Sequence, residues 1–323
     1  MKDPVDTHPL VSVCLIVFNH AKYIEGSLKS ILSQKTSFPY ELIIHDDAST
    51  DESVKIIKKI LHGRTENIKL IFQKINQYSQ GIGPDGIAMK EARGEFIAYC
   101  DGDDFWSNTG KLQYQVDRLR EYKDCNLCFH SSNVLNESNL YGFYGDKEKI
   151  IQCEDIIAKG GVAMPMASIL IRREVVSSII SKSNDFYSHN MSHFMYQFFG
   201  SYGGGALYLP KIMSTYRRFS EGSWSSKMKE NPTSQVAIVE YFIDSIQKAD
   251  RMTEYTYTQF FAPIIRLRIN SILRRDSISV DRREVFYKKV SGLLKVKSKL
   301  EWFFIFKWPF LHKLVFFLFK KRR

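Results

Sequence analysis

The sequence lacks the glycine-rich loops that mark two common nucleotide-binding folds. No Gly-x-Gly-x-x-Gly follows its first apolar run, Val11 to Phe18, and no Gly-x₄-Gly-Lys-[Ser/Thr] occurs anywhere in the chain. Such loops cradle phosphates in dinucleotide-binding domains and in P-loop NTPases. Their absence argues against both classes of protein.

Cysteine is scarce and does not form a pattern. The chain has five cysteines, and Cys125 and Cys128 form a single Cys-x-x-Cys with no second pair. A structural zinc site needs four ligands, so neither zinc nor redox chemistry is predicted. Cys14 and Cys100 fall in apolar runs, where a thiol behaves as a small hydrophobe. The pattern suits a reducing cytoplasm.

Outside its last 29 residues, the chain has little excess of positive over negative charge. The net charge is +11, but the last 29 residues hold nine Lys or Arg and one Glu, which is about +8 of the total. A nucleic-acid partner is not predicted, because no basic face is spread along the chain. The segment Met1 to Pro9 is polar and carries acids, so a secretory signal is not expected there.

What is present is a large globular composition with alternating elements. The chain has 323 residues, of which 44% are hydrophobic and 25% charged. Short apolar runs alternate with helix-period segments, and the predicted strands are 11–18, 41–45, 68–72, 95–100 and 126–130. This alternation predicts an α/β fold, with a Rossmann-like, mainly parallel sheet and helices on both faces.

The second half is predicted to be organised differently. Residues 139–161 are expected to be irregular, and residues 220–234 read as a linker rich in Ser, Gly and Asn. Helical patterns follow at 235–248 and 253–275. We therefore expect one domain over residues 1–225 and a helical C-terminal region over residues 226–323.

Three carboxylates follow one predicted strand. The segment Phe96 to Trp106 reads Phe-Ile-Ala-Tyr-Cys-Asp-Gly-Asp-Asp-Phe-Trp, which places Asp101, Asp103 and Asp104 around one glycine. Carboxylates this close repel one another unless a cation lies between them, and Mg²⁺ or Mn²⁺ suits all-oxygen ligands. The pattern predicts a divalent-cation site that also holds a diphosphate. A solvated acidic turn is the alternative for this segment alone.

Polar residues follow the first two predicted strands as well, namely Asn19-His20 and Asp46-Asp47. In parallel α/β sheets, ligands bind beyond the carboxyl ends of the strands. The three polar clusters together therefore predict one binding edge. The segment Ser49 to Glu52 fits a helix-capping box, with Ser49 as the cap.

The segments that carry these clusters resemble the family 2 glycosyltransferases with the GT-A fold, particularly bacterial enzymes that build surface polysaccharides. The matching segments are Val11 to Asn19, His45 to Asp51 and Tyr99 to Trp106, and Tyr208 to Arg217 is similar to a later family segment. The resemblance covers roughly residues 10–225. It implies a nucleotide-sugar donor and direct displacement with inversion at the anomeric carbon.

The resemblance also implies roles for individual residues. The implied nucleotide-binding residues are Ile16, Val17, Phe18, Asn19, Asp47, Lys74, Asn76 and Asp103. The implied ligands of Mg²⁺ or Mn²⁺ are Asp103, Asp104 and, as a third member, Asp101. The Asp47 carboxylate is suited to accept the N3–H of uracil. Arg217 and Arg218 are expected either to neutralise the diphosphate or to be ordinary surface charges.

The sequence differs from its relatives at the position of the base, the residue that takes the proton of the acceptor hydroxyl. They usually have an Asp just before the helix that begins here near Phe194, and this chain has His193. A histidine acts as a general base near neutral pH, and a structural role at the helix start is the alternative. Asp185 and His189 are nearby candidates. Phe219 stands where relatives often have a histidine.

The prediction is thus an inverting, metal-dependent glycosyltransferase with a UDP-linked donor and a lipid-linked oligosaccharide or lipopolysaccharide acceptor. A sugar nucleotidyltransferase is a second candidate, but it usually has a glycine-rich basic loop after the first strand, which Asn19 to Lys22 lacks. A third candidate is a degenerate relative that binds nucleotide without catalysis.

The end of the chain is aromatic and basic. The segment Trp302 to Phe319 is interrupted by Lys307, Pro309, His312 and Lys313, and the last four residues are Lys-Lys-Arg-Arg. These interruptions disfavour a membrane span and suit an amphipathic element on anionic lipid. We expect a peripheral protein at the cytoplasmic face of the bacterial inner membrane. A helix packed on the domain or an oligomer contact is the alternative.

Overall fold

The computed structural model describes residues 8–64, 66–135, 137–182, 193–219 and 232–307. The chain divides into two compact units, Met1–Lys227 and Met228–Arg323. All five cysteines are buried and free.

The first unit is built around one mixed sheet with the strand order β3-β2-β1-β4-β9-β6-β10-β5. The strands on this path are β1 (Val11–Val17), β2 (Tyr40–Asp46), β3 (Ile68–Phe72), β4 (Phe96–Asp101), β5 (Phe105–Trp106), β6 (Leu127–Val134), β9 (Leu170–Arg172) and β10 (Ala206–Tyr216). Strands β1 to β4 are mutually parallel, as predicted. Strand β9 runs antiparallel to β4 and β6 and separates this half from the rest of the sheet.

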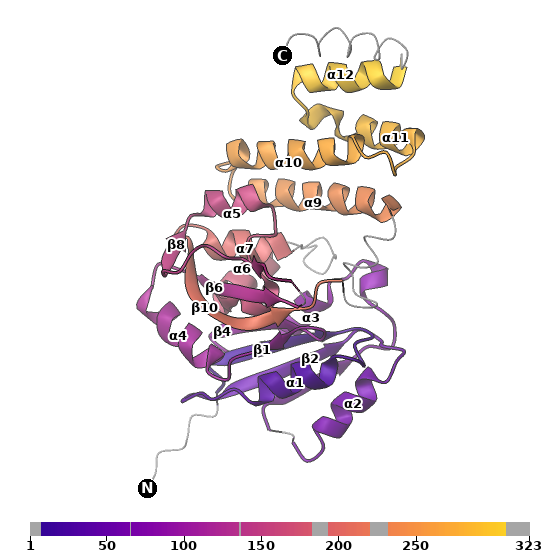
Figure 1. Ribbon diagram of the computed structural model, residues 1–323. Coiled ribbons are helices and arrows are strands. Elements are labelled where there is room, and N and C mark those ends of the chain that lie inside the picture. The colour runs from indigo at the N-terminus through magenta and orange to yellow at the C-terminus, as the bar shows by residue number, and fades with distance from the viewer. Residues whose placement is uncertain (1–7, 65, 136, 183–192, 220–231, 308–323) are drawn as a thin grey trace. The chain divides into compact units, whose positions relative to one another are not determined.

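Helices cover both faces of the parallel half (Figure 1). Helices α1 (Ile24–Leu32), α2 (Ser53–Ile60) and α4 (Lys111–Glu121) share an apolar core with one face of the sheet. Helix α3 (Pro84–Lys90) packs on β1 and β2 from the other side. Helices α6 (Arg173–Lys182) and α7 (His193–Ser201) pack on each other, with α6 against β9 and α7 against β6. Because every residue of β1 is buried, its continuous apolar run is explained by burial on both faces.

Two local expectations were wrong. Residues 139–161 are not irregular, because they contain β7 (Leu140–Tyr141), β8 (Lys149–Ile151) and α5 (Cys153–Lys159). Strand β7 pairs with β6 and β8 pairs with β10, so these short strands extend the sheet. Ser49 does not cap α2, which begins at Ser53 and has Glu52 at its N-cap position.

The order of the strands makes a topological switch point beside β1. The chain passes from β1 to β2 and β3 on one side and then returns to place β4 on the other side of β1. At such a switch point the connections leave in opposite directions, and ligands bind beyond the carboxyl ends of the two strands. Here these ends are Val17 and Asp101.

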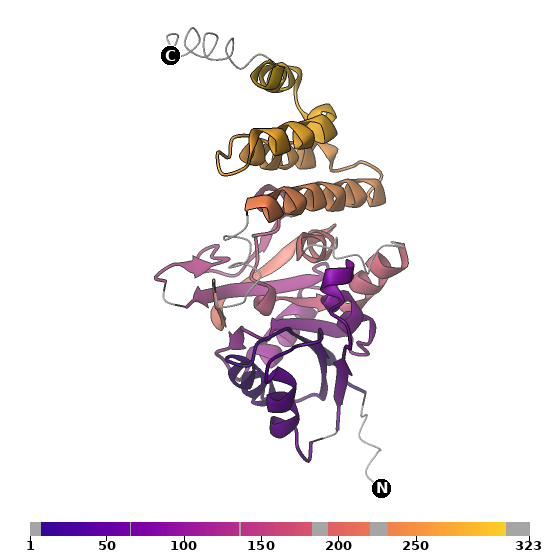
Figure 2. The same cartoon turned by 90° about the vertical axis from the view of Figure 1, so that its right-hand side faces the viewer.

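The second unit is helical, as predicted. Its main helices are α9 (Pro232–Met252), α10 (Thr258–Leu273), α11 (Val280–Val290) and α12 (Val296–Lys307). Each packs on the next along the chain, as the view in Figure 2 shows. Among the described residues, no helix is both long and apolar enough to cross a membrane. The predicted tail beyond Lys307 lies outside the described residues.

Candidate functional site

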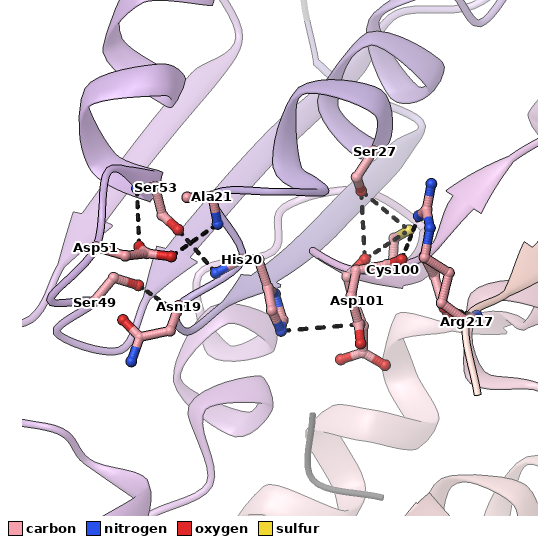
Figure 3. A network of polar contacts seen from close by, with 12 residues as sticks. Asn19, His20, Ala21, Ser27, Ser49, Asp51, Ser53, Cys100, Asp101 and Arg217 are labelled. Atoms are coloured by element: carbon pink, nitrogen blue, oxygen red, sulfur yellow. Dashed lines mark hydrogen bonds and ion pairs between the residues drawn. The ribbon is translucent and has the colours of Figure 1, made fainter. Parts of the chain in front are cut away.

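The three predicted polar clusters lie at one edge of the sheet. In the strand register, Val17 is paired with Asp46 and Ile16 with Asp101, so the carboxyl ends of β1, β2 and β4 are level. Figure 3 shows the turn after β1 beside the loop that follows β2, with Asp101 nearby. The parallel register thus brings together residues that are far apart in the sequence.

The turn after β1 is held by side chains of the β2–α2 loop. The N–H groups of residues 19–21 donate in turn to Ser49 Oγ, Ser53 Oγ and Asp51 Oδ2 at 2.8, 2.9 and 2.9 Å. Asn19 has a left-handed φ of 57°, a conformation that asparagine tolerates better than most residues. The Ser49 hydroxyl therefore supports this turn rather than capping α2.

The end of β1 contributes mainly framework to the site. The carbonyl of Ile16 accepts the N–H of Gly102 at 2.7 Å, and that of Val17 accepts the N–H of Asp47 at 2.8 Å. The side chains of Ile16 and Val17 are buried. Among the four predicted nucleotide-binding residues of this segment, Phe18 and Asn19 are the ones that keep solvent-accessible side chains.

Asp47 is a buried carboxylate that fixes the segment after β3. Its Oδ1 accepts the N–H of Gln77 at 2.7 Å, and its Oδ2 accepts the N–H of Tyr78 at 3.0 Å and Asn76 Nδ2 at 2.9 Å. Burial raises the pKa of Asp47, while the bonds from Tyr78 and Gln77 oppose that rise. A carboxylate has about four acceptor positions. One position therefore remains for an N–H of a ligand.

The two predicted contacts beyond β3 have different surroundings. The Asn76 amide donates to both the carbonyl and the carboxylate of Asp47, and its Oδ1 accepts the N–H of Ser79 at 2.7 Å. This amide is therefore held within its own loop. Lys74 is exposed at the same edge of the sheet. A contact of either residue with a nucleotide stays a prediction.

Residues 101–104, here called the acidic elbow, place three carboxylates in different environments. Asp101 Oδ1 accepts the hydroxyl of Tyr99 at 2.6 Å, and desolvation followed by the charge of Asp103 raises the pKa of Asp101 to about 7. Asp104 is 3% exposed, and burial followed by the charges of Asp103 and Asp101 raises its pKa. Asp103 Oδ1 lies 4.0 Å from His20 Nε2. Burial and mutual repulsion thus disfavour the charged forms of Asp101 and Asp104.

A glycine allows the elbow to lie against β1. A Cβ on Gly102 would lie 2.6 Å from His20 Nδ1, 3.2 Å from the carbonyl oxygen of Ile16 and 3.2 Å from Val17 Cγ2. The Gly102 N–H is also the donor that bonds to Ile16. A side chain at this position would push the elbow away from the end of β1.

The elbow fits a cation only in part. Among the described residues, no group of three or more His, Cys, Asp and Glu side chains is arranged to hold a metal ion. Asp101 is bonded to Tyr99 and Asp104 to the backbone N–H of Arg217, so these contacts do not decide which two carboxylates would be the ligands. Mg²⁺ is typically held by one or two carboxylates together with substrate phosphates and water. The elbow residues would therefore fit a divalent cation only together with ligands from outside the protein, and the cation stays a prediction.

His193 lies at the start of α7, close to the end of β4. Its ring is 5.8 Å from the ring of Tyr99 in an edge-on arrangement, and Tyr99 bonds in turn to Asp101. The imidazole is solvent accessible. Desolvation by the surrounding protein nevertheless lowers the pKa of His193, and the negative charge of Asp85 opposes this shift. The ring thus lies beside Tyr99, whose hydroxyl bonds to the first carboxylate of the elbow, and its role as the base stays a prediction. Asp185 and His189 lie outside the described residues.

Comparison with known proteins gives the family of the chain. Residues 12–177 match the model of glycosyl transferase family 2. The match spans the polar edge from the end of β1 to the acidic elbow and covers more than half of the chain. The chain belongs to this family, and the resemblance stated from its sequence is confirmed.

Individual relatives are more distant. An uncharacterised protein of Mycobacterium tuberculosis is 29% identical over 226 residues, which cover 67% of this chain and 61% of that protein. The Escherichia coli protein WfaP, named a UDP-Glc:α-D-GlcNAc-diphosphoundecaprenol β-1,3-glucosyltransferase, is 39% identical over 132 residues, or 41% of this chain and 48% of WfaP. The chain thus spans about half to three fifths of the length of these relatives.

A solved structure supports the fold. The crystal structure of residues 1–349 of Staphylococcus aureus TarS, in complex with UDP-GlcNAc, aligns with a TM-score of 0.64 at 19% identity. The alignment covers 91% of this chain and 86% of that structure. At this identity the likeness shows the fold alone, which is the GT-A type predicted from the sequence.

Proposed function

We propose that this protein is an inverting, divalent-cation-dependent glycosyltransferase that moves a sugar from a UDP-linked donor to a lipid-linked oligosaccharide or lipopolysaccharide acceptor. The observation that carries the proposal is that the acidic elbow and Asp47 follow strand ends that lie level with each other, at the switch point between β1 and β4. Family membership supports sugar transfer. The UDP and lipid-diphosphate parts draw on what the names of WfaP and TarS state of those proteins.

The residues divide between donor binding and proton transfer. Asp47 offers its remaining acceptor position to the N3–H of a uracil, and Asp103 and Asp104 face the diphosphate. A divalent cation bound there would supply Lewis-acid stabilisation of the leaving diphosphate. His193 accepts the proton of the acceptor hydroxyl as that oxygen attacks the anomeric carbon from the side opposite the diphosphate. Bond formation and bond cleavage then invert the anomeric centre without a covalent enzyme intermediate.

The test is incubation with Mn²⁺ or Mg²⁺ and a panel of UDP-, GDP- and dTDP-sugars, with and without polyprenyl-diphosphate-linked GlcNAc. We expect release of UDP that depends on the cation and on the lipid-linked acceptor, with a glycolipid product of opposite anomeric configuration to the donor. The readouts are nucleotide release and mass spectrometry of the lipid. Pyrophosphate formed from a sugar phosphate and UTP would indicate a nucleotidyltransferase. Donor binding without turnover would indicate a non-catalytic relative.

We further propose that the protein lies peripherally on an anionic membrane, at the cytoplasmic face of a bacterial inner membrane, through α12 and the basic segment after it. Four apolar residues at helical spacing on α12 are exposed by 41–74%, namely Val296, Leu300, Phe303 and Phe304. Trp302, on the other face, is 5% exposed, and its Nε1 donates to Asn270 Oδ1 at 3.0 Å. Lysines flank the exposed stripe at positions 295, 297, 299 and 307. An apolar stripe flanked by lysines suits anionic lipid.

We expect Leu300→Glu combined with Phe304→Glu to reduce binding to phosphatidylglycerol vesicles several-fold, because both changes put charge into the apolar stripe. Co-sedimentation with vesicles measures the bound fraction. Val280→Glu combined with Val285→Glu is the control with the same change in charge, since both valines lie on α11 and each is 56% exposed. Unchanged co-sedimentation of the double variant would remove the membrane proposal and leave sugar transfer untouched.

A further inference from the structure

The acidic elbow is followed at once by a two-residue strand with two different sides. Strand β5 pairs antiparallel with β10, with Trp106 opposite Ser214 and Phe105 opposite Thr215. Side chains of successive strand residues point to opposite faces. Phe105 is half-buried, whereas Trp106 is 4% exposed and belongs to the core. The position of β5 therefore sets where the elbow can lie.

On one side, Arg217 connects β10 to the elbow. Its N–H donates to Asp104 Oδ1 at 2.9 Å, and its Nη1 donates to the carbonyl oxygen of Asp103. The guanidinium carbon lies 4.7 Å from the centre of the Phe105 ring and 5.2 Å from that of Tyr23. The guanidinium is thus placed against the elbow and between two aromatic rings.

On the other side, a buried lysine holds Trp106. Lys111 has no exposed surface, its Nζ lies 4.1 Å from the centre of the Trp106 ring, and it donates to Gln115 Oε1 at 2.7 Å. The Trp106 N–H donates to Ser30 Oγ on α1 at 3.0 Å. Core contacts therefore hold Trp106. On the other side of β5, Phe105 contacts the guanidinium of Arg217.

We infer that Arg217 is a positioning residue that fixes the acidic elbow for cation and diphosphate binding, rather than a residue that binds the diphosphate itself. Its side chain contacts the carbonyl oxygen of Asp103 and two aromatic rings, whereas the Asp104 carboxylate accepts the backbone N–H of Arg217. A planar guanidinium stacks on rings and bonds a carbonyl oxygen at the same time, which a lysine ammonium does not reproduce. The inference rests on the proposed function, since it treats the elbow as the donor site.

If Arg217 acted through its charge alone, its replacement would change the cation affinity in the opposite direction. A positive charge beside three carboxylates weakens cation binding, so a residue that acted only as a countercharge would increase cation affinity when removed. A residue that holds the elbow in place lowers cation affinity when removed, because the ligands then lose their arrangement. The sign of the change in Mn²⁺ affinity therefore separates the two roles.

The experiment compares Arg217→Gln and Arg217→Lys with Arg218→Gln in the full chain. Arg218 is the matched control, because it is the adjacent arginine, is exposed, and among the described residues contacts Glu137 across 3.5 Å and the ring of Phe219 rather than the elbow. Mn²⁺ binding without nucleotide is measured by electron paramagnetic resonance, UDP binding by calorimetry, and hydrogen exchange by mass spectrometry on the peptide spanning residues 101–106. Thermal unfolding reports any global loss of stability.

We expect both Arg217 variants to weaken Mn²⁺ binding by about tenfold or more, the range typical for residues that orient metal ligands. Exchange in the elbow peptide should accelerate in both, while Arg218→Gln matches the unmodified protein. The Mn²⁺ concentration for half-maximal turnover should rise in parallel with the Mn²⁺ dissociation constant.

Three results would overturn the inference. Tighter Mn²⁺ binding in Arg217→Gln that Arg217→Lys reverses would make Arg217 a countercharge. Weaker UDP binding with unchanged Mn²⁺ affinity and unchanged exchange would make it a diphosphate ligand. Unchanged exchange in Arg217→Gln would exclude the positioning role even if the unmodified protein transferred no sugar. Hydrogen exchange thus separates failure of this inference from failure of the proposed function.

Discussion

Asp104→Asn is expected to lower sugar transfer at least about a hundredfold, because several kcal/mol of charge stabilisation at the leaving group is lost with the carboxylate. The amide keeps the shape of the side chain and an acceptor for the Arg217 N–H, which bonds to Asp104 Oδ1. The loss would therefore be one of charge rather than of packing. Initial rates at saturating donor, with Mn²⁺ varied, measure it.

The same variant is expected to unfold at an equal or higher temperature at pH 8. Burial and the neighbouring carboxylates raise the pKa of Asp104 in the folded state. When a carboxyl has a higher pKa folded than unfolded, the folded state binds more protons, so stability falls as pH rises through and above the unfolded value. Removing the charge removes this penalty, and the variant should lose less stability between pH 5 and pH 8.

Asp117→Asn is the control for Asp104→Asn, because Asp117 is exposed on α4 and its carboxylate accepts only the amide of Gln113 among the described contacts. Its activity and unfolding temperature should match those of the unmodified protein. An Asp104→Asn variant that kept full, Mn²⁺-dependent turnover would refute the cation assignment at the elbow.

His193→Ala should lower kcat by about 10²- to 10⁴-fold, the usual contribution of a general base, and should leave donor binding unchanged. The ring lies beside Tyr99 in β4 and is not among the described hydrogen-bond partners of the Asp47 carboxylate. Desolvation lowers the pKa of His193, so the neutral base persists below its ordinary value of about 6.5. Activity of the unmodified protein should accordingly fall only below about pH 6.5.

Calorimetry with UDP separates binding from turnover in this variant. Asp185→Asn and His189→Asn, made in parallel, test the two other candidates for the base. If Asp185→Asn loses turnover while His193→Ala keeps it, the base is Asp185. His193 then has a structural role at the start of α7.

Much of the fold was predictable because its signals are local. A continuous run such as Val11 to Val17 reads as a strand buried on both faces, and alternation with helices requires a mainly parallel sheet. Residues 139–161 were misread because β7, β8 and α5 are too short to show a period. Strand β10 runs from Ala206 to Tyr216 through an irregularity between Leu209 and Ser214 that apolar patterning does not mark.

The candidate site was predictable in position and less so in detail. The sequence placed Asp47 and the acidic residues at strand ends, and the parallel register made these ends level. The reading of Arg217 as a possible diphosphate contact missed its bonds to the elbow. No local pattern marks a guanidinium that stacks on Phe105, because its backbone lies more than a hundred residues away in the chain.

The sequence by itself determined that three carboxylates follow a buried strand and that the chain alternates between strands and helices, because apolar periodicity and turn chemistry act over a few residues. Only the tertiary structure decided how each carboxylate is held: Asp47 by the segment 76–78, Asp101 by Tyr99 and Asp104 by Arg217. The partners of Asp47 begin 29 positions away along the chain, and the partner of Asp104 lies 113 positions away. Only the packing of the sheet brings these donors and acceptors within hydrogen-bond distance.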